Sequence, residues 1–594
     1  MSVTEHDLDG LCVNTIRGLC MDAIERARSG HPGTPLGMAP VAYTLWQRHL
    51  RFDPADPIWP NRDRFVLSEG HASALLWSLL HLAGVRAVDP DYEVLGRAAV
   101  TLEDLKTFRQ LGSKCPGHPE YRWTSGVETT TGPLGQGVAT SVGMAIAGRW
   151  LAARYNRDGF PLFDFDVYAL AGDGCMMEGI ASEAASLAGH QGLSNLCWIY
   201  DSNRVTIEGH TGITFTEDVA ARFLAYGWNV TTVADANDLD AAARAFRVFQ
   251  AEHQRPTLVV VHSHIGYGSP AEDSPKAHGE PLGPAGVRAA KRFLGLPEDA
   301  EFYITEEVRE HFAHGIGARG QAARRAWQAK YGQYQAAYPG LAGELEHIQR
   351  RELPDGWQAA LLAFPPDENG IASRDSSGQV LNQLAQAIPW LLGGSADLSP
   401  STKTRLVFDG AGDFQAGQRN GRNLHLGVRE HAAAAIANGL ALAKLRPFWS
   451  GFLIFSDYAR GAYVLAEAGG GTPAVVLLAT GSEVHLALAA RRELAGEGIA
   501  ARVVSMPCWE LFDRQPRQYR DHVIPPAVRA RVAVEQASTL GWDRYVGDGG
   551  AVIGMRTFGA SAPLKQLAAK FGFTPGRVAQ AARQCLAAQR AAAS

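Results

Sequence analysis

Two short apolar runs on either side of a helical segment form the clearest pattern in this chain. Residues 165–171 and 196–200 are apolar and bounded by polar residues, so both are predicted to be buried strands. Residues 178–190, between them, have helical spacing and contain no proline. The pattern predicts one βαβ unit that places an acidic residue, Asp173 or Asp201, at the end of each strand.

The alternation of strand and helix patterns continues along the chain. Further strands are expected at 64–67, 228–233, 257–264, 474–480, 501–505, 532–535 and 551–555, and helices at 7–28, 138–155, 238–254, 432–443, 483–496 and 578–593. Strands that alternate with helices favour parallel sheets covered on both faces. The predicted fold class is therefore α/β, with doubly wound domains.

The length of 594 residues is too great for a single core and predicts two to four domains. Charged residues make up 20% of the chain and the net charge is −5, which argues against nucleic acid as the principal partner. No apolar run approaches the length of a membrane span, and the acidic N-terminus does not resemble a signal peptide. Seven scattered cysteines without a CxxC pair fit the reduced thiols of a cytoplasmic protein.

The acidic strand ends suggest a metal site. Mg²⁺ takes oxygen ligands, usually one or two carboxylates completed by phosphate oxygens. Asp173 offers a carboxylate, Asn203 a side-chain carbonyl and Val205 a main-chain oxygen, while glycines flank Asp173 and allow a diphosphate to approach. The competing interpretation is a tight strand-end turn with a capping Asn. The pairing of Asp173 with an Asn that follows the next strand favours the metal and diphosphate.

Three histidines stand in glycine-containing loops, which permit close approach of a ligand: His31, His71 and His118. Each alone is more often structural or solvated, but together they suggest a polyhydroxyl or phosphate site. Residues 128–137 form a glycine-rich loop before a long helix, which is a ready anion site. The spacing of its glycines does not match a dinucleotide fingerprint.

The segments 172–180 and 201–209, together with the Thr-Gly-Pro-Leu-Gly-Gln-Gly of residues 131–137, resemble the thiamine diphosphate-dependent transketolase family. The resemblance extends from the first helix to the last strand. It implies three domains: residues 1–335 with a linker to about 365, a pyrimidine-binding domain at 366–468, and a C-terminal domain at 469–594.

The resemblance assigns roles to residues of the first domain. Thiamine diphosphate would be bound by His71, Gly132, Leu134, Asp173, Gly174, Asn203 and His278, and Mg²⁺, with Ca²⁺, Mn²⁺ or Co²⁺ able to substitute, by Asp173, Asn203 and Val205. His31, His118 and His278 would act as catalytic acids and bases on substrate hydroxyls, and His31 and His278 would also bind substrate.

The second domain contributes its own set. Glu430 precedes an alanine-rich helix, and burial there is expected to raise the pKa of its carboxyl. In the family this residue bonds the aminopyrimidine ring, although a favourable charge at a helix start is also physically sound. Asp397 would lie near the thiazolium ring and Phe455 would stack on the pyrimidine, while Arg374 and Ser401 would bind a sugar phosphate.

The chain departs from the family after Arg460, where further strands and helices should follow. Too few residues lie between 374 and 466 for an ordinary α/β domain of about 100–150 residues. The missing part would remove a portion of the acceptor site and leave exposed sheet edges. A compensated deletion, a degenerate paralogue and a sequence error all remain open.

The resemblance implies transfer of a two-carbon ketol group from xylulose 5-phosphate to ribose 5-phosphate or a similar aldose phosphate, in the pentose phosphate pathway or the Calvin cycle. It also implies a cytoplasmic homodimer with active sites at its interface. One alternative is a catalytically impaired homologue that binds cofactor or partner chains. Another is a related thiamine enzyme, such as a deoxyxylulose phosphate or dihydroxyacetone synthase, which matches the quoted segments less well.

Overall fold

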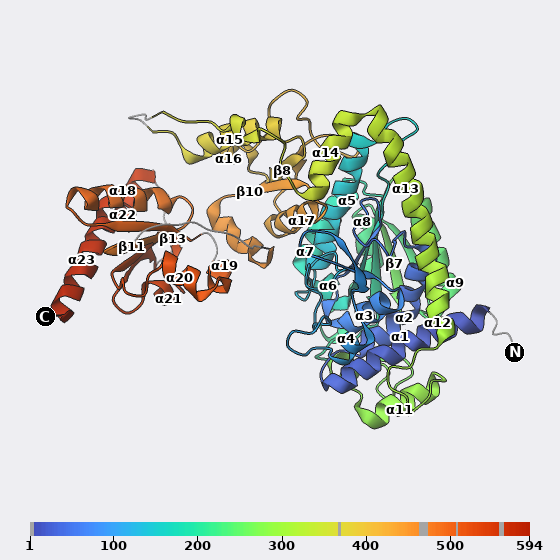
Figure 1. The fold of residues 1–594 in the computed structure, drawn as a ribbon. Coiled ribbons are helices and arrows are strands. Elements are labelled where there is room, and N and C mark those ends of the chain that lie inside the picture. The colour runs from blue at the N-terminus through green and yellow to red at the C-terminus, as the bar shows by residue number, and fades with distance from the viewer. Residues whose placement is uncertain (1–4, 366–369, 463–472, 507–508, 557–563, 594) are drawn as a thin grey trace. The chain divides into compact units, whose positions relative to one another are not determined.

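A computed structural model describes residues 5–365, 370–462, 473–506, 509–556 and 564–593 (Figure 1). The chain divides into two compact units, Met1–Ala462 and Tyr463–Ser594. The first unit holds two sheets and a hairpin, and the second unit holds one sheet. Each unit is described by itself.

The first sheet carries the predicted βαβ unit. Its five strands run parallel in the order β1-β4-β5-β7-β6. They are β1 (Arg64–Leu67), β4 (Val167–Gly172), β5 (Leu196–Ser202), β6 (Asn229–Val233) and β7 (Thr257–His262). Each agrees with a predicted strand to within a few residues, because a strand covered on both faces is a continuous apolar run.

Helices cover both faces of this sheet, and alternate strand residues face opposite layers. Tyr168 and Leu170 belong to one core cluster, Ala169 and Ala171 to the other. The first layer contains α1 (Glu5–Ala27), α2 (Gly33–Thr44), α3 (Ser73–Leu82), α9 (Leu239–Ala251) and α12 (Glu306–Phe312). The second contains α5 (Gln136–Tyr155), α7 (Gly179–His190) and α8 (Val219–Ala225). The fold is therefore doubly wound, as predicted.

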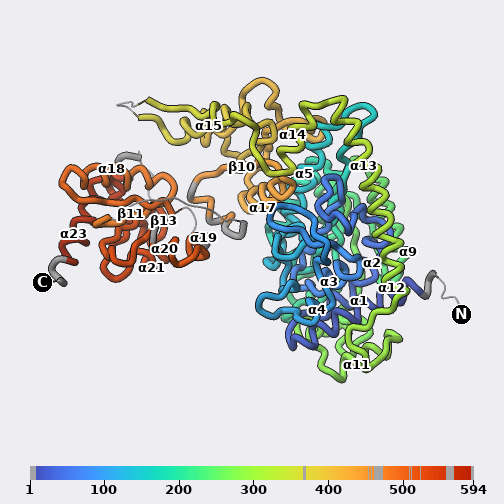
Figure 2. The backbone as a smooth tube through the Cα atoms, viewed as in Figure 1, coloured from blue at the N-terminus to red at the C-terminus, as the bar shows by residue number. Residues whose placement is uncertain are grey.

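Short helices and a helical pair complete this part of the first unit. The short helices are α4 (Leu102–Lys106), α6 (Asp173–Met177), α10 (Pro275–Gly279) and α11 (Gly283–Phe293). The pair, in the predicted linker, is α13 (Ala318–Ala337) and α14 (Pro339–Arg350). In Figure 2, α13 runs along the body of the unit, where Trp327 donates to the Leu162 carbonyl at 2.6 Å and Tyr334 to the Tyr155 carbonyl at 2.8 Å.

The second sheet has three parallel strands in the order β10-β8-β9: β8 (Leu391–Ser395), β9 (Asn423–His425) and β10 (Arg446–Ser450). With it lie α15 (Ser373–Ala387), α16 (Ser399–Thr402), α17 (Glu430–Leu442) and the 3₁₀ segment η6 (Leu453–Ala462). All five residues of β10, a terminal strand, are only half-buried. Within the described residues this sheet is small and has an edge at β10.

Helix α17 joins the second sheet to the first. It crosses α5 so closely that a Cβ added at Gly143 would lie 2.1 Å from the Ile436 carbonyl oxygen. At Gly439 an added Cβ would lie 2.1 Å from the Thr140 carbonyl oxygen. Glycine on both helices is therefore what permits the crossing, and the crossing places the start of α17 beside α7, where Glu183 accepts from the Ala432 N–H at 3.0 Å.

The second unit contains a parallel sheet in the order β12-β11-β13-β14. Its strands are β11 (Val475–Ala479), β12 (Ala501–Ser505), β13 (Arg531–Ser538) and β14 (Ala551–Met555). On one face pack α18 (Glu483–Gly496), α22 (Leu564–Phe571) and α23 (Pro575–Ala593); on the other pack α19 (Trp509–Arg514), α20 (Arg517–Val523) and α21 (Asp543–Val546). All four strands match predicted ones.

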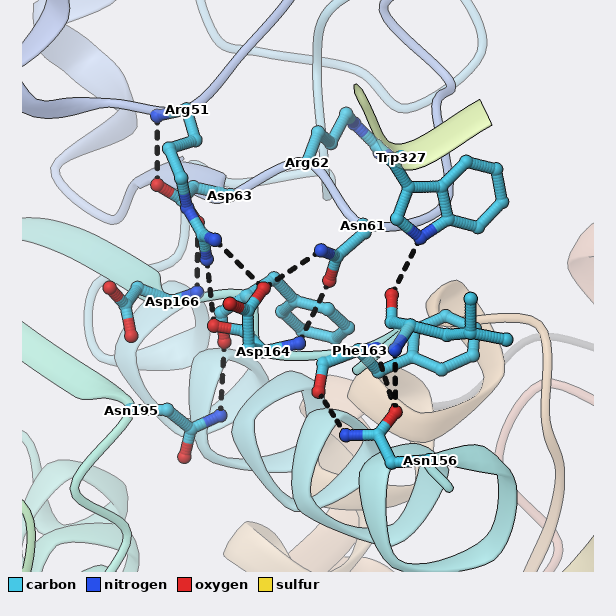
Figure 3. Close-up of polar contacts among 12 residues, drawn as sticks. Arg51, Asn61, Arg62, Asp63, Asn156, Phe163, Asp164, Asp166, Asn195 and Trp327 are labelled. Carbon is cyan, nitrogen blue, oxygen red and sulfur yellow. Dashed lines mark hydrogen bonds and ion pairs between the residues drawn. The ribbon is translucent and has the colours of Figure 1, made fainter. Parts of the chain in front are cut away.

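Several elements were not predicted, among them α2, α3 and a β-hairpin. Strands β2 (Arg86–Val88) and β3 (Val94–Ala98) form an antiparallel hairpin. The segment that leads into β1 is tied by side-chain hydrogen bonds to the segment that leads into β4 (Figure 3). Asn61 donates to Asp164 at 2.8 Å and accepts from its N–H at 2.9 Å, while Asp63 accepts from the Asp166 N–H at 2.9 Å.

The six cysteines within the described residues are free and buried, and Cys508 lies outside those residues. Burial raises the pKa of the Cys175 thiol to about 11. Among the described residues, no helix is both long and apolar enough to cross a membrane.

Candidate functional site

The predicted metal ligands come together at the ends of β4 and β5. Asp173 is buried; one carboxylate oxygen accepts from the Tyr200 hydroxyl at 2.6 Å and the other from the Arg204 N–H at 2.9 Å. The Asn203 side-chain oxygen accepts from the Val205 N–H at 3.0 Å. Burial raises the pKa of Asp173. A divalent cation at these oxygens would favour the charged carboxylate and offset that cost.

Two acidic residues near Asp173 were not predicted as site residues. Asp201 is fully buried and accepts from Asn203 at 2.7 Å and from the Ser263 hydroxyl. Burial, with the charge of Asp173, raises its pKa to about 7. Burial and the charges of Asp201 and Asp173 hold the pKa of Glu69 well above its usual range. Three carboxyl groups thus converge at this strand edge, although Glu69 follows β1, far away in the sequence.

Three of the predicted histidines form a cluster. The ring centroids of His31 and His71 lie 5.0 Å apart, those of His71 and His278 5.0 Å, and those of His31 and His278 5.9 Å. His118 lies nearby, since a Cβ added at Gly132 would lie 3.4 Å from its ring. The loops that hold them come from four separate places in the chain, so only the fold assembles this group.

The histidine rings are held in the neutral form. Burial, then the positive charge of Arg109, lowers the pKa of His31 to about 4, and burial also lowers those of His71, His118 and His278. The Arg109 guanidinium donates to His31 Nδ1 at 3.1 Å. Because Nδ1 accepts that bond, Nε2 carries the hydrogen and can donate to a substrate oxygen.

The glycine-rich loop lies between the histidines and the acidic edge. A Cβ added at Gly70 would lie 2.8 Å from the Gly132 nitrogen, and one at Gly174 would lie 2.7 Å from Leu134 Cδ1. Gly132 itself has φ +152, a conformation that side chains rarely adopt. The predicted residues Gly132, Leu134 and Gly174 therefore form one cradle with the loops of His71 and Asp173.

Several buried polar atoms around this cradle lack a partner within the described residues: Glu69 Oε1, Arg109 Nε, Thr131 Oγ1 and His278 Nδ1. Unpaired buried polar groups cost free energy, and their clustering marks a place where a ligand completes the hydrogen bonding. A metal ion that carries a diphosphate needs a carboxylate and an amide oxygen as ligands, and the diphosphate needs hydrogen-bond donors and closely approaching main chain. All of these groups are present here. The residues present fit thiamine diphosphate with a divalent cation.

The site residues predicted in the second domain lie on the elements around the second sheet. Arg374 and Asp397 are exposed, and Ser401 and Glu430 are half-buried. Phe455 is half-buried in η6, with its ring centroid 6.1 Å from that of Phe452. In the described part of the chain, no polar or ring contact joins these five to Asp173 or to the histidines.

Known families match all three parts of the chain. Residues 8–354 match the family described as "Transketolase, thiamine diphosphate binding domain", 369–490 the "Transketolase, pyrimidine binding domain", and 461–574 the "Transketolase-like TK C-terminal domain".

Individual relatives match over almost their whole length. The transketolase of Geobacillus stearothermophilus is 41% identical, with 98% of this chain and 99% of that protein covered. The transketolase of Bacillus subtilis is 39% identical, with 95% and 97% covered. Among solved structures, a Pichia stipitis transketolase in complex with sedoheptulose 7-phosphate superimposes with a TM-score of 0.85 at 35% identity, covering 98% of each chain. The transketolase from Leishmania mexicana gives 0.84 at 36%, covering 97% of each.

The alignment with the Geobacillus protein spans 680 positions, more than the 594 residues of this chain. It therefore leaves many positions of that relative without a counterpart here. The second and third family matches overlap at residues 461–490, next to the boundary between the two units. Both observations agree with the expected shortening of the second domain, which stays a prediction.

Proposed function

The chain belongs to the transketolase family, and on that premise we propose that it transfers a two-carbon ketol group from xylulose 5-phosphate to ribose 5-phosphate or a similar aldose phosphate. It is a thiamine diphosphate-dependent enzyme. Such substrates would place it in the pentose phosphate pathway or the Calvin cycle, and in the cytoplasm.

The observation that carries this proposal is the neutral histidine cluster beside the acidic strand edge. Asp173, Asn203 and Val205 would hold Mg²⁺, which in turn would hold the diphosphate. Thiamine diphosphate held there would supply the carbon nucleophile and the electron sink needed to cleave the ketose C2–C3 bond. His31, His71, His118 and His278 would then orient substrate hydroxyls and move their protons, because neutral imidazole can both donate and accept.

Glu430 is proposed to hold a proton at the ring nitrogen of the aminopyrimidine, with Phe455 against that ring and Asp397 near the thiazolium. Arg374 suits a sugar phosphate because its guanidinium fork offers paired donors, and Ser401 would add a hydroxyl. Within the described residues, Glu430 and the other site residues of the second domain have no direct contact with the histidines of their own chain. This supports a homodimer in which each subunit completes the other's site.

Exposed apolar side chains support that homodimer. Val428 is 73% exposed, Ile454 70% and Tyr458 66%, and these residues flank Glu430 and Phe455. Large apolar side chains gathered on a surface commonly mark an interface with another protein. A second subunit over α17 and η6 would bury them and also shield Glu430 from water.

The catalytically impaired homologue is a second candidate because of one observation. The second sheet has three strands in the described residues, and its terminal strand β10 is only half-buried. Loss of strands beyond β10 would remove part of the acceptor site.

A coupled ketol-transfer assay with both sugar phosphates, Mg²⁺ and thiamine diphosphate tests the proposal. We expect turnover in the wild type and a loss of at least about a hundredfold in Glu430→Ala, because general acid–base groups contribute on the order of 10²–10⁴. Glu310→Ala, at an exposed carboxylate on α12, is the matched control and should keep full activity. Absence of turnover from a folded dimer that binds cofactor would favour the impaired homologue.

A further inference from the structure

A cavity of about 290 Å³ lies beneath the β2–β3 hairpin. None of the site residues discussed above lines it. Its walls come from the loop before β1, the hairpin, residues 121–128 and the end of α17. Arg97, Arg122 and Trp123 line it and are exposed, so the cavity opens to solvent.

Positive charge dominates the lining. Asp89 and Glu128 are its carboxylates, and they face six cations: Arg62, Arg64, Arg97, Lys114, Arg122 and Lys444. Glu128 is already engaged by Arg62, at 2.7 Å.

Lys444 and Arg64 are two of the cations that have no carboxylate partner within the described residues. Lys444 Nζ donates to the main-chain and side-chain oxygens of Gln349, both at 3.0 Å. The buried Arg64 donates to the Pro60 carbonyl at 2.9 Å and to that of Arg62. Taking a charge out of water without an opposite charge is costly, so an anion in the cavity would lower the free energy of this arrangement.

Three positively charged side chains surround the ring of Tyr92 at the hairpin tip. Its ring centroid lies 4.9 Å from the Arg122 guanidinium, 5.1 Å from Lys444 Nζ and 5.4 Å from the Arg351 guanidinium. Tyr92 has φ 65, in the left-handed region that favours glycine. Cation–π contacts of about 0.5–2 kcal/mol do not cancel three positive charges. The hairpin thus holds an aromatic side chain over a cluster of cations at some conformational cost.

The cations also act on one another. Burial, then the charges of Arg62, Arg351 and Arg64, lowers the pKa of Lys444 to about 7. A bound anion would offset this repulsion. The lining also has an apolar part, which includes Pro57, Leu95, Leu151 and Phe163, and the cavity has more room than a lone phosphate would fill.

We propose that this cavity is a binding site for a small organic phosphate, with the phosphate among the cations around Tyr92 and the carbon part against the apolar wall. Guanidinium forks and an ammonium group are the usual protein partners of a phosphate. The site is separate from the one assigned to the sugar phosphates of the reaction, and it brings together the hairpin and the residues that follow α17.

Pyridoxal 5′-phosphate is a suitable probe on the full-length enzyme loaded with Mg²⁺ and thiamine diphosphate. Its aldehyde condenses with a neutral lysine amine, losing water, and borohydride then reduces the imine to a stable amine. Peptide mapping should find saturable labelling at Lys444, at least tenfold above that at the exposed Lys570. Pyridoxal, which lacks the phosphate, should label Lys444 at least tenfold less.

Variants and competitors sharpen the test. Arg122→Ala should reduce labelling of Lys444 at least fivefold while ketol transfer stays unchanged, and Lys444→Met should abolish labelling at this site. Glycerol 3-phosphate should protect Lys444 at concentrations where inorganic phosphate does not. Equal labelling by pyridoxal and its phosphate, or no effect of Arg122→Ala, would overturn the proposal. Equal protection by inorganic phosphate would overturn the proposal that the ligand is an organic phosphate, and would indicate a site for the free anion instead.

Discussion

The protonation states of single residues at the candidate site follow from burial and from immediate neighbours. Arg109 donates to His31 Nδ1 and adds positive charge beside it, so the histidine stays neutral and its Nε2–H is free to donate. Asp173 and Asp201 are carboxyl groups at one buried strand edge, where burial raises the pKa of both and the charge of Asp173 disfavours ionisation of Asp201. A cation bound between the two carboxyl groups would allow both to be ionised.

Asp173→Asn tests that interpretation. The amide keeps the size of the side chain but removes the negative charge, so the affinity for Mg²⁺ and thiamine diphosphate should fall on the order of tenfold or more. Isothermal titration calorimetry measures it, with far-ultraviolet circular dichroism as a check on folding. The exposed Asp158→Asn is the control. Unchanged affinity in Asp173→Asn would remove this carboxylate from the metal site.

Among the elements, the crossing of α5 and α17 depends on glycine. Alanine at position 143 would place a methyl group 2.1 Å from the Ile436 carbonyl oxygen and 2.9 Å from Gly439 Cα. Both contacts are with main chain, which cannot move aside without separating the helices. The position of Glu430, the first residue of α17, depends on this contact.

Gly143→Ala should therefore destabilise the first unit by about 1–3 kcal/mol, as overpacking of a core usually does. Thermal unfolding should show a lower melting temperature. Gly332→Ala is the matched control, because an alanine there meets nothing within 4 Å on the exposed face of α13. It should stabilise the helix by about 1 kcal/mol. A Gly143 variant as stable as the wild type would mean that the two helices can separate at little cost.

For the whole molecule, one buried carboxyl group of the second unit makes the stability of the fold depend on pH. In the second unit, burial and then the charge of Glu483 raise the pKa of Glu535 to about 8. The folded state therefore retains a proton that the unfolded state loses near pH 4.5. Between these values the folded state binds more protons, so stability falls as pH rises from about 4.5 to 8.

Glu535→Gln removes this titration while keeping a side chain of similar size. Its melting temperature should exceed that of the wild type at pH 8 by more than at pH 5. Scanning calorimetry of the full chain at both values measures the difference, and the exposed Glu497→Gln, which loses only its pairing with Arg583, should not reproduce it. The same difference at both pH values would show that Glu535 does not titrate in this range.

The sequence alone determined most of the fold, because strands buried on both faces leave continuous apolar runs. Strands β1, β12 and β14 have the bounds predicted for them, and β4 and β5 differ only at their ends. The meeting of Asp173 and Asn203 was also predictable, since residues that follow neighbouring parallel strands must meet at one edge, whereas their role as metal ligands stays a proposal. The β2–β3 hairpin was not predicted, because its short, half-exposed strands carry no continuous apolar run.

Other features were decided only by the tertiary structure. The sequence around Glu69 has no pattern that predicts a place in the acidic site. Only the pairing of β1 with β4 brings Glu69 toward Asp173 and Asp201. Lys444 and Tyr92 are far apart in the sequence, and their contact depends on α17 packing against α5. Periodicity along a chain reports what is buried locally, whereas charges that converge from distant segments are set by how the elements pack.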